Sequence, residues 1–249
     1  MRYFDGMAES KVTLTARRMP GKYESVPIEA VTWSWIENAI QYRDFTYRRR
    51  QKHFSGLYWA ATMGAHVAYE SRLELGSAML ADFDPSVQFI LSQPFQLSEP
   101  QGRTIRRHVP DYLLRYADDR VCVVDVKPRV QLSKPGVRSQ FEWTRRILEA
   151  RGWEYRVESE VDAVLLENIR FLAGYRRDFE FDHDHVHRGL SALTGEMSFG
   201  HAIRTLEPIC GSAAVARGVV LRLLWKQGLV ADLSVPLEST SAVAVVLDA

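Results

Sequence analysis

The chain has 249 residues, of which 46% are hydrophobic, and its 32 basic and 31 acidic residues give a formal net charge of +1. It can bury a sizeable core, and its charge neither supports nor excludes a polyanion such as DNA as a partner. Only two cysteines occur, no signal peptide opens the sequence and no apolar stretch approaches roughly 20 residues, so we expect a soluble, cytoplasmic protein without a disulfide framework.

Residues 1–60 are expected to form an N-terminal extension that packs on the core. An alternating stretch, KVTLTAR, occupies residues 11–17, and the aromatic and acidic segment PIEAVTWSWIENA follows at 27–39. A basic run, YRRRQKHF, occupies 47–54. The tryptophans are assigned to the core rather than to stacking on bases.

Residues 61–180 show the pattern of an α/β core. Apolar residues recur at helical spacing within 66–85, where Asp84-Pro85 ends the helix, and a second, amphipathic helix is predicted over 139–155. Strands are predicted at residues 86–97, 104–116 and 120–128. Residues 161–177 begin another strand or helix. This order predicts a mixed β-sheet flanked by helices.

The last part of the chain has a different pattern. The polar segment RRDFEFDHDHVHRG, at 176–189, marks a boundary, and its alternating His183, His185 and His187 are interpreted as part of a connector rather than a metal site. Two helices and a two-stranded ribbon are predicted within 183–249. Helices followed by a terminal hairpin are typical of a small winged-helix domain.

A pair of aspartates stands at the open end of the predicted hairpin HVPDYLLRYADDRVCVVDVKP, residues 108–128. A three-residue loop, either 117–119 or 118–120, would place Asp111 opposite Asp125 or Lys127 on the same face. A two- or four-residue loop would place Asp111 opposite Val126, on the wrong face unless a bulge intervened. We therefore predict an odd-length loop or a bulge.

This hairpin end has the chemistry of a metal-dependent hydrolase. Asp111 and Asp125 supply hard oxygen ligands suited to Mg²⁺ or Mn²⁺, which water and a backbone carbonyl, that of Val126, would complete. Lys127 lies on the same side and would hold the attacking water or stabilise charge on a phosphate. A third carboxylate is expected from the preceding helix, as Glu74 or alternatively Glu70. Taken alone, Asp-x-Lys is more often a solvated strand end.

The order of these features is the pattern of the PD-(D/E)xK nuclease class. The segments HFSGLYWAATMGAHVAYESRLELGSAMLADFDPSVQFILSQPF, HVPDYLLRY and VVDVKP further resemble TnsA-type endonuclease subunits of heteromeric transposases, over roughly residues 25–240. The resemblance implies a restriction-endonuclease-like domain followed by a winged helix. It also implies cleavage of the 5′ strands at transposon ends, beside a DDE transposase subunit that cuts and joins the 3′ strands.

The resemblance assigns roles residue by residue. The catalytic glutamate falls on Glu74, the strand aspartate on Asp111 and the catalytic lysine on Lys127. Asp125 departs from the glutamine often found two positions before that lysine, and the change should strengthen metal binding. The resemblance also implies that the C-terminal domain docks regulatory partners, notably an ATPase. The five basic and six acidic side chains of residues 183–249 favour such docking over binding to phosphates.

DNA is expected to contact basic side chains outside this centre. The candidates are Arg48, Arg49, Arg50, Lys52, Arg106 and Arg107. Two other functions are compatible with the sequence. One is a stand-alone restriction-like or repair endonuclease with the same chemistry, and the other is a catalytically inactive DNA-binding or assembly module.

Overall fold

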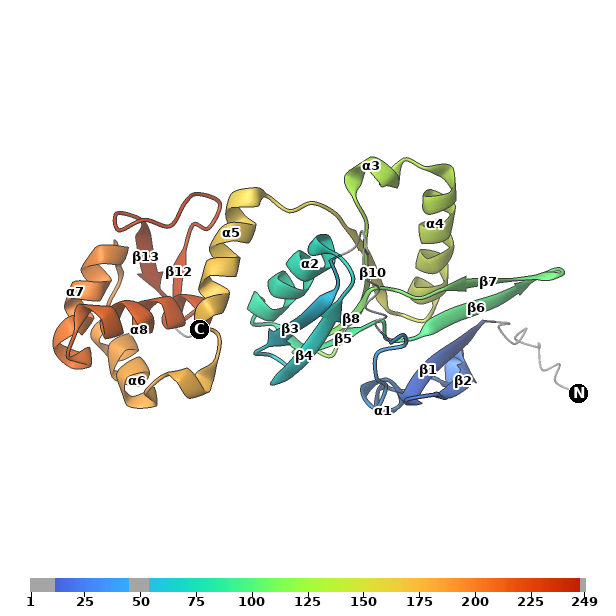
Figure 1. Ribbon diagram of the computed structural model, residues 1–249, viewed down its shortest axis with the longest axis horizontal. Helices are drawn as coiled ribbons and strands as arrows, with labels where there is room; N and C mark the ends of the chain where they lie inside the picture. Colours follow the sequence, from blue (N-terminus) through green and yellow to red (C-terminus); the bar gives the residue numbers. More distant parts are fainter. Residues whose placement is uncertain (1–11, 45–53, 247–249) are drawn as a thin grey trace, which may run out of the picture. The chain divides into compact units, whose positions relative to one another are not determined.

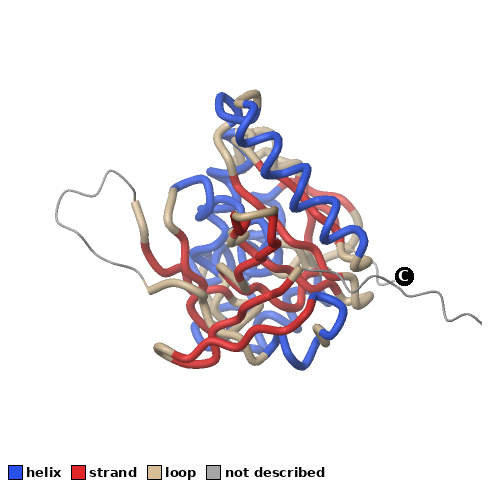
Figure 2. The backbone as a smooth tube through the Cα atoms, turned by 90° about the vertical axis from the view of Figure 1, so that its right-hand side faces the viewer, coloured by secondary structure: helices blue, strands red, loops and turns tan. Residues whose placement is uncertain are grey.

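The computed structural model describes residues 12–44 and 54–246, which fold into two compact units. The first unit holds the chain up to Tyr58, together with Val67–Leu75 and Gln88–Ser159. The second holds Trp59–His66, Gly76–Val87 and Glu160–Ala249. Most of the helices and strands are labelled in Figure 1, and Figure 2 shows the backbone with helices in blue and strands in red.

An antiparallel sheet of order β2-β1-β6-β7 opens the first unit. Its strands are β1 (Thr13–Met19), β2 (Lys22–Pro27), β6 (Gln96–Gln101) and β7 (Thr104–His108). The alternation in KVTLTAR turns Leu14 and Ala16 into the core, where both are fully buried. Two short helices follow β2, η1 (Ile28–Ala30) and α1 (Trp33–Glu37).

The second sheet of this unit has the order β10-β9-β8-β5 and positions the site. Its strands are β5 (Val87–Ser92), β8 (Tyr112–Tyr116), β9 (Val121–Val126) and β10 (Glu154–Glu158). β9 pairs antiparallel with β8 and parallel with β10, so the predicted mixed sheet is confirmed. Cys122, Val123 and Val124 are fully buried, as expected for a strand covered on both faces.

Helix α4 (Pro135–Ala150) makes the crossover from β9 to β10, after the short helix α3 (Arg129–Leu132). Pro135 begins α4, and Gly152, with φ of +82°, ends it in the left-handed conformation. Its apolar stripe, including Trp143, Ile147 and Leu148, packs into one core with residues of both sheets. Figure 1 shows α4 standing over the β6–β7 hairpin.

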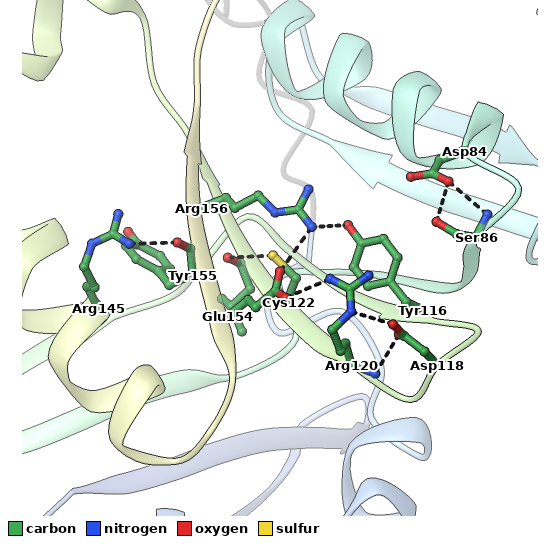
Figure 3. A network of polar contacts seen from close by, with 11 residues as sticks. Asp84, Ser86, Tyr116, Asp118, Arg120, Cys122, Arg145, Glu154, Tyr155 and Arg156 are labelled. Atoms are coloured by element: carbon green, nitrogen blue, oxygen red, sulfur yellow. Dashed lines mark hydrogen bonds and ion pairs between the residues drawn. The ribbon is translucent and has the colours of Figure 1, made fainter.

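The turn between β8 and β9 has the predicted odd length. Tyr116 N donates to Arg120 O at 2.9 Å, which leaves the three-residue loop 117–119, and Asp119 takes a φ of +66°. Tyr112 pairs with Val124, so the same register carries Asp111 to the position opposite Asp125. Figure 3 shows the Arg120 side chain holding the turn through Asp118.

One strand prediction and one helix prediction are wrong in their extent. The single strand predicted over 104–116 is two strands in different sheets, because Pro110 lacks an amide donor and interrupts the ladder between β7 and β8. The helix predicted within 66–85 is preceded by a strand, β4 (Ala65–Tyr69), which pairs with β3 (Gly56–Ala60). The helix itself, α2 (Arg72–Phe83), ends just before Asp84 as predicted.

The second unit is mainly helical. It contains most of α2, then α5 (Ala163–Leu172), α6 (His183–Ala192), α7 (Phe199–Cys210) and α8 (Ala213–Trp225), with the short helices η2 (Ala173–Tyr175) and η3 (Asp178–Glu180). The predicted ribbon is β12 (Leu229–Ala231) and β13 (Ala242–Val245), and β11 (Glu196–Ser198) adds a third strand in the order β11-β13-β12.

The interpretation of His183, His185 and His187 as part of a connector is wrong. They lie in the first two turns of α6, where the Asp182 side chain accepts a hydrogen bond from Asp184 N and caps the helix. Among the described residues, no single helix is long and apolar enough to cross a membrane, and α7 with α8 passes that test only as a pair bent by 118°.

Candidate active site

A cleft of about 900 Å³ opens in the first unit at the open end of the β8–β9 hairpin. All four predicted catalytic residues line it, and they reach it from three elements. Its lining includes Glu74 from α2, Asp111 before β8, and Asp125 and Lys127 at the end of β9. The fold therefore brings these residues together although they are spread over more than fifty positions of the chain.

Asp111 is held by the neighbouring strand. Its Oδ2 accepts a hydrogen bond from Val126 N at 2.7 Å, and its own amide donates to Val124 O at 3.1 Å. Burial, together with the nearby carboxylates of Asp125 and Glu74, raises the pKa of Asp111 to about 8, although the Val126 amide and Lys127 lower it. The positive charge near Asp111 is thus too small to offset burial and its acidic neighbours.

Asp125 is buried, with 3% of its surface exposed, at the end of the buried strand β9. His108 Nε2 lies 2.7 Å from its Oδ2, and the Tyr155 hydroxyl donates to the same oxygen. Burial and the Asp125 charge raise the pKa of Tyr155, so this phenol remains protonated and acts as a donor. Asp125 therefore has two hydrogen-bond donors, one from β7 and one from β10.

Glu74 caps the N-terminus of α2 and also lines the cleft. Ser71 Oγ accepts from Glu74 N at 3.1 Å and donates to Glu74 Oε1 at 2.9 Å, and Glu70 N donates to Glu74 Oε2 at 2.7 Å. These contacts form a capping box at the start of α2. Burial raises the pKa of Glu74. Glu70 also lines the cleft, so the alternative assignment to Glu70 stays open.

Substitutions at these two glutamates separate capping from catalysis. Glu74→Gln keeps a side chain that can cap α2, so we expect unchanged thermal stability but strongly reduced cleavage. Glu74→Ala should lose cleavage and also about 1 kcal/mol of stability. Glu70→Gln is the matched control and should change neither. Thermal unfolding and cleavage rates measure the two effects, and loss of cleavage in Glu70→Gln alone would move the assignment to Glu70.

Lys127 is anchored through its backbone while its side chain lines the cleft. Its amide donates to Glu158 O at 2.9 Å, and its carbonyl accepts from Ser159 Oγ at 2.9 Å. Its charge lowers the pKa values of Glu74 and Asp111, although burial outweighs it at both residues. One ammonium therefore faces a group of acidic side chains that it does not neutralise.

The chemistry of the aspartate pair fits a divalent cation. Carboxylates that share a buried cleft repel each other, and a hard divalent cation is the ligand that would offset this repulsion. Within the described residues, no three His, Cys, Asp or Glu side chains form a ready metal cluster. Glu74 already accepts hydrogen bonds at both oxygens, so the fit rests on Asp111 and Asp125.

The predicted DNA-binding residues have different surroundings. Arg107 is exposed and lines the cleft, whereas Arg106 donates to Gln140 Oε1 and Ser139 Oγ and lies 5.0 Å from the Trp143 ring centroid. The remaining candidates lie outside the described residues; they are Arg48, Arg49, Arg50 and Lys52.

The residues not predicted from the sequence include Arg43 and His108, which line the cleft, and Tyr155, which donates a hydrogen bond to Asp125. His108 stands two residues before Pro110 in the motif itself and could have been singled out by that position. Tyr155 reaches Asp125 only because β10 pairs in parallel with β9 after the α4 crossover, with Tyr155 beside Val123. No motif or spacing in the sequence around Arg43 would have singled it out as a cleft residue. Long-range pairing therefore adds residues that periodicity does not reveal.

Comparison with known proteins points to the same part of the chain. No curated protein matches the chain closely enough to count as a relative. Residues 84–160 match the model of a family described as TnsA-like endonuclease N terminal, a stretch that contains Asp111, Asp125 and Lys127 and begins after Glu74. The match implies DNA binding and partnership with a transposase. It confirms the resemblance to TnsA-type endonucleases over residues 84–160 and indicates a nuclease of the transposase type.

Proposed function

We propose that the protein is a metal-dependent DNA endonuclease subunit of a transposase. It hydrolyses the 5′-strand phosphodiester at transposon ends in concert with a DDE transposase subunit. The observation that carries this proposal is the convergence of Asp111, Asp125 and Lys127 in one cleft, within the stretch that matches the nuclease family.

The residues of the cleft have different proposed roles in catalysis. Asp111, Asp125 and the Val126 carbonyl would hold Mg²⁺ or Mn²⁺. Glu74, whose oxygens already accept hydrogen bonds, would complete the site by orienting water. When bound, the ion supplies an activated water nucleophile and neutralises charge on the phosphate. Lys127 orients the water or stabilises the negative charge that develops on the scissile phosphate. The buried wall formed by β9 keeps these groups in a poorly hydrated environment, where such interactions are strong.

DNA is proposed to enter past Arg43 and Arg107. Both side chains are exposed and line the cleft. Burial raises the pKa of Tyr42 and the charges of both arginines offset part of that rise, so both lie near Tyr42. Two guanidinium groups at the rim of the cleft suit contacts with phosphates flanking the cleaved bond. Arg106 already packs on Trp143, so its proposed contact with DNA would be made from a stacked position.

Removing either rim arginine should weaken DNA binding without sequence preference. We expect Arg43→Ala and Arg107→Ala each to reduce the slope of log affinity against log salt concentration by about 1, because each removes one phosphate contact. Arg170→Ala, at an exposed position on α5 in the second unit, is the control and should leave the slope unchanged. Fluorescence anisotropy over a salt series measures the slopes, and equal slopes for all proteins would contradict the proposed DNA path.

The C-terminal part is proposed to be a winged-helix domain over residues 183–249, following a nuclease domain over 61–180. The order α6, β11, α7, α8, β12, β13 and the sheet order β11-β13-β12 support this assignment. Because acidic residues outnumber basic ones there, we propose that this domain docks a regulatory ATPase. Salt-dependent DNA binding that maps to this domain would reverse that proposal.

Cleavage assays test the central proposal. Transposon-end DNA mixed with the protein, its partner transposase and Mn²⁺ should be nicked on the 5′ strand, and EDTA should stop the reaction. Asp125→Ala should abolish nicking while the protein remains folded. Robust cutting of naked DNA without a partner would instead favour a stand-alone restriction-like or repair nuclease. A protein that neither binds Mn²⁺ nor cuts DNA would be an inactive assembly module.

A further inference from the structure

Two side chains from different strands converge on a single oxygen of Asp125. His108 Nε2 lies 2.7 Å from Asp125 Oδ2, and the Tyr155 hydroxyl also donates to Oδ2. A carboxylate that binds a cation can only accept hydrogen bonds, so in the metal-bound state that we consider His108 donates from its Nε2–H. These two donors occupy Oδ2, which leaves Oδ1 as the oxygen of Asp125 that remains for a cation.

Both donors are fixed in place by the sheets that carry them. Tyr155 is 4% exposed, its strand pairs with β9, and Arg145 lies 5.1 Å from its ring centroid while donating to its carbonyl at 3.0 Å. His108 ends β7, where it pairs with Leu97. Groups held on strands keep their geometry better than groups on loops. The Asp125 carboxylate is therefore held against rotation about its terminal bond.

The two hydrogen bonds do more than supply the buried Asp125 carboxylate with donors. Two donors that only satisfied Asp125 could serve its two oxygens separately, yet both serve Oδ2, and Asp125 lines the cleft. Hydrogen bonds from neighbouring side chains to a metal-binding residue fix the orientation of that residue, and losing one typically costs about 10–100-fold in metal affinity. The two donors thus determine which oxygen of Asp125 is available to bind an ion.

We propose that His108 and Tyr155 are positioning residues that restrict Asp125 to binding a cation through one oxygen, and that they thereby favour Mg²⁺ or Mn²⁺ over Ca²⁺. Ca²⁺ takes more oxygen ligands and commonly uses both oxygens of a carboxylate, whereas Mg²⁺ takes six ligands at shorter distances. A carboxylate that cannot rotate offers the larger ion one ligand fewer. This inference rests on the proposed function, because it needs the metal site.

Ion binding by the full-length protein without DNA tests the proposal. Mn²⁺ affinity is measured by electron paramagnetic resonance and Ca²⁺ affinity by competition, with thermal unfolding recorded for every variant. Tyr155→Phe and His108→Ala should each weaken Mn²⁺ binding about 10-fold and raise the affinity for Ca²⁺ relative to Mn²⁺. His108→Gln, which retains a donor at a similar position, should stay near the wild-type values.

Tyr116→Phe is the matched control. It removes a buried hydroxyl from β8 that contacts Arg156 near the hairpin turn, so it should change neither affinity (Figure 3). Folded Tyr155→Phe and His108→Ala proteins with wild-type affinities and an unchanged ratio would overturn the proposal, as would an equal shift in Tyr116→Phe. Failure of the wild-type protein to bind Mn²⁺ would instead remove the metal site itself, so the two failures are distinguishable.

Discussion

Lys127→Ala is expected to reduce the rate of DNA cleavage by about 10²–10³-fold. That is the usual effect of removing one positioned group that stabilises charge in the transition state. The Lys127 side chain faces the acidic residues of the cleft, while its backbone is held by Glu158 and Ser159. Substitution therefore removes the ammonium without disturbing the strand. Single-turnover cleavage rates at saturating DNA and metal measure the effect.

Binding and folding should survive this substitution. Lys127 does not supply a metal ligand, so Mn²⁺ affinity should be retained or rise slightly as a repelling charge is lost. Lys134→Ala, at the exposed residue that precedes α4, is the matched control and should cleave at the wild-type rate. A Lys127→Ala protein that cleaves as fast as Lys134→Ala would contradict the catalytic assignment.

Asp111→Asn is expected to stabilise the metal-free protein while abolishing metal binding. Burial and two neighbouring carboxylates raise the pKa of Asp111 to about 8, far above the value of about 4 in an unfolded chain. An amide carries no charge in the cleft and can still accept the hydrogen bond from Val126 N. We expect a gain of several kcal/mol at high pH, since a pKa difference of about four units at about 1.4 kcal/mol each sets an upper bound of about 5–6 kcal/mol.

The stabilisation should depend on pH in a defined direction. Between pH 4 and pH 8 the folded protein holds a proton on Asp111 that the unfolded chain has lost, so the contribution of Asp111 to the stability of the metal-free wild type falls as pH rises through this range. The variant lacks this titration, and its advantage should grow from pH 5 to pH 9. Thermal unfolding in EDTA at these pH values measures the difference.

Metal should reverse the order of stabilities. Mn²⁺ binds the ionised carboxylate, so it should stabilise the wild type, and more strongly at pH 8 than at pH 6, but leave Asp111→Asn unchanged. Asp118→Asn is the control in the exposed turn. Arg120 lowers the pKa of Asp118, so this group is ionised in the folded and unfolded states from pH 5 to pH 9, and the difference from the wild type should not change with pH. A pH-independent difference between Asp111→Asn and the wild type would contradict the assigned pKa of Asp111.

Much of the site could be predicted because it is local in the chain. The hairpin places Asp111 opposite Asp125 through a loop of three residues, and the alternation of strand side chains sends Lys127 to the same side as Asp125. These relations depend only on the pairing register of the hairpin and on the two-residue alternation of side chains along a strand. The mixed sheet, α2 and α4 followed from equally local patterns of apolar residues.

Only the tertiary structure decided how distant segments meet at this hairpin. Pro110 divides a stretch with one continuous apolar pattern between two sheets, and that division brings His108 to Asp125. Tyr155 reaches the same carboxylate through the parallel pairing of β10 with β9. Periodicity encodes which face of an element is buried, whereas the partner of a buried polar group depends on the pairing of strands far apart in sequence. The sequence by itself thus determined the acidic hairpin end, and the long-range contacts decided how its carboxylates are held.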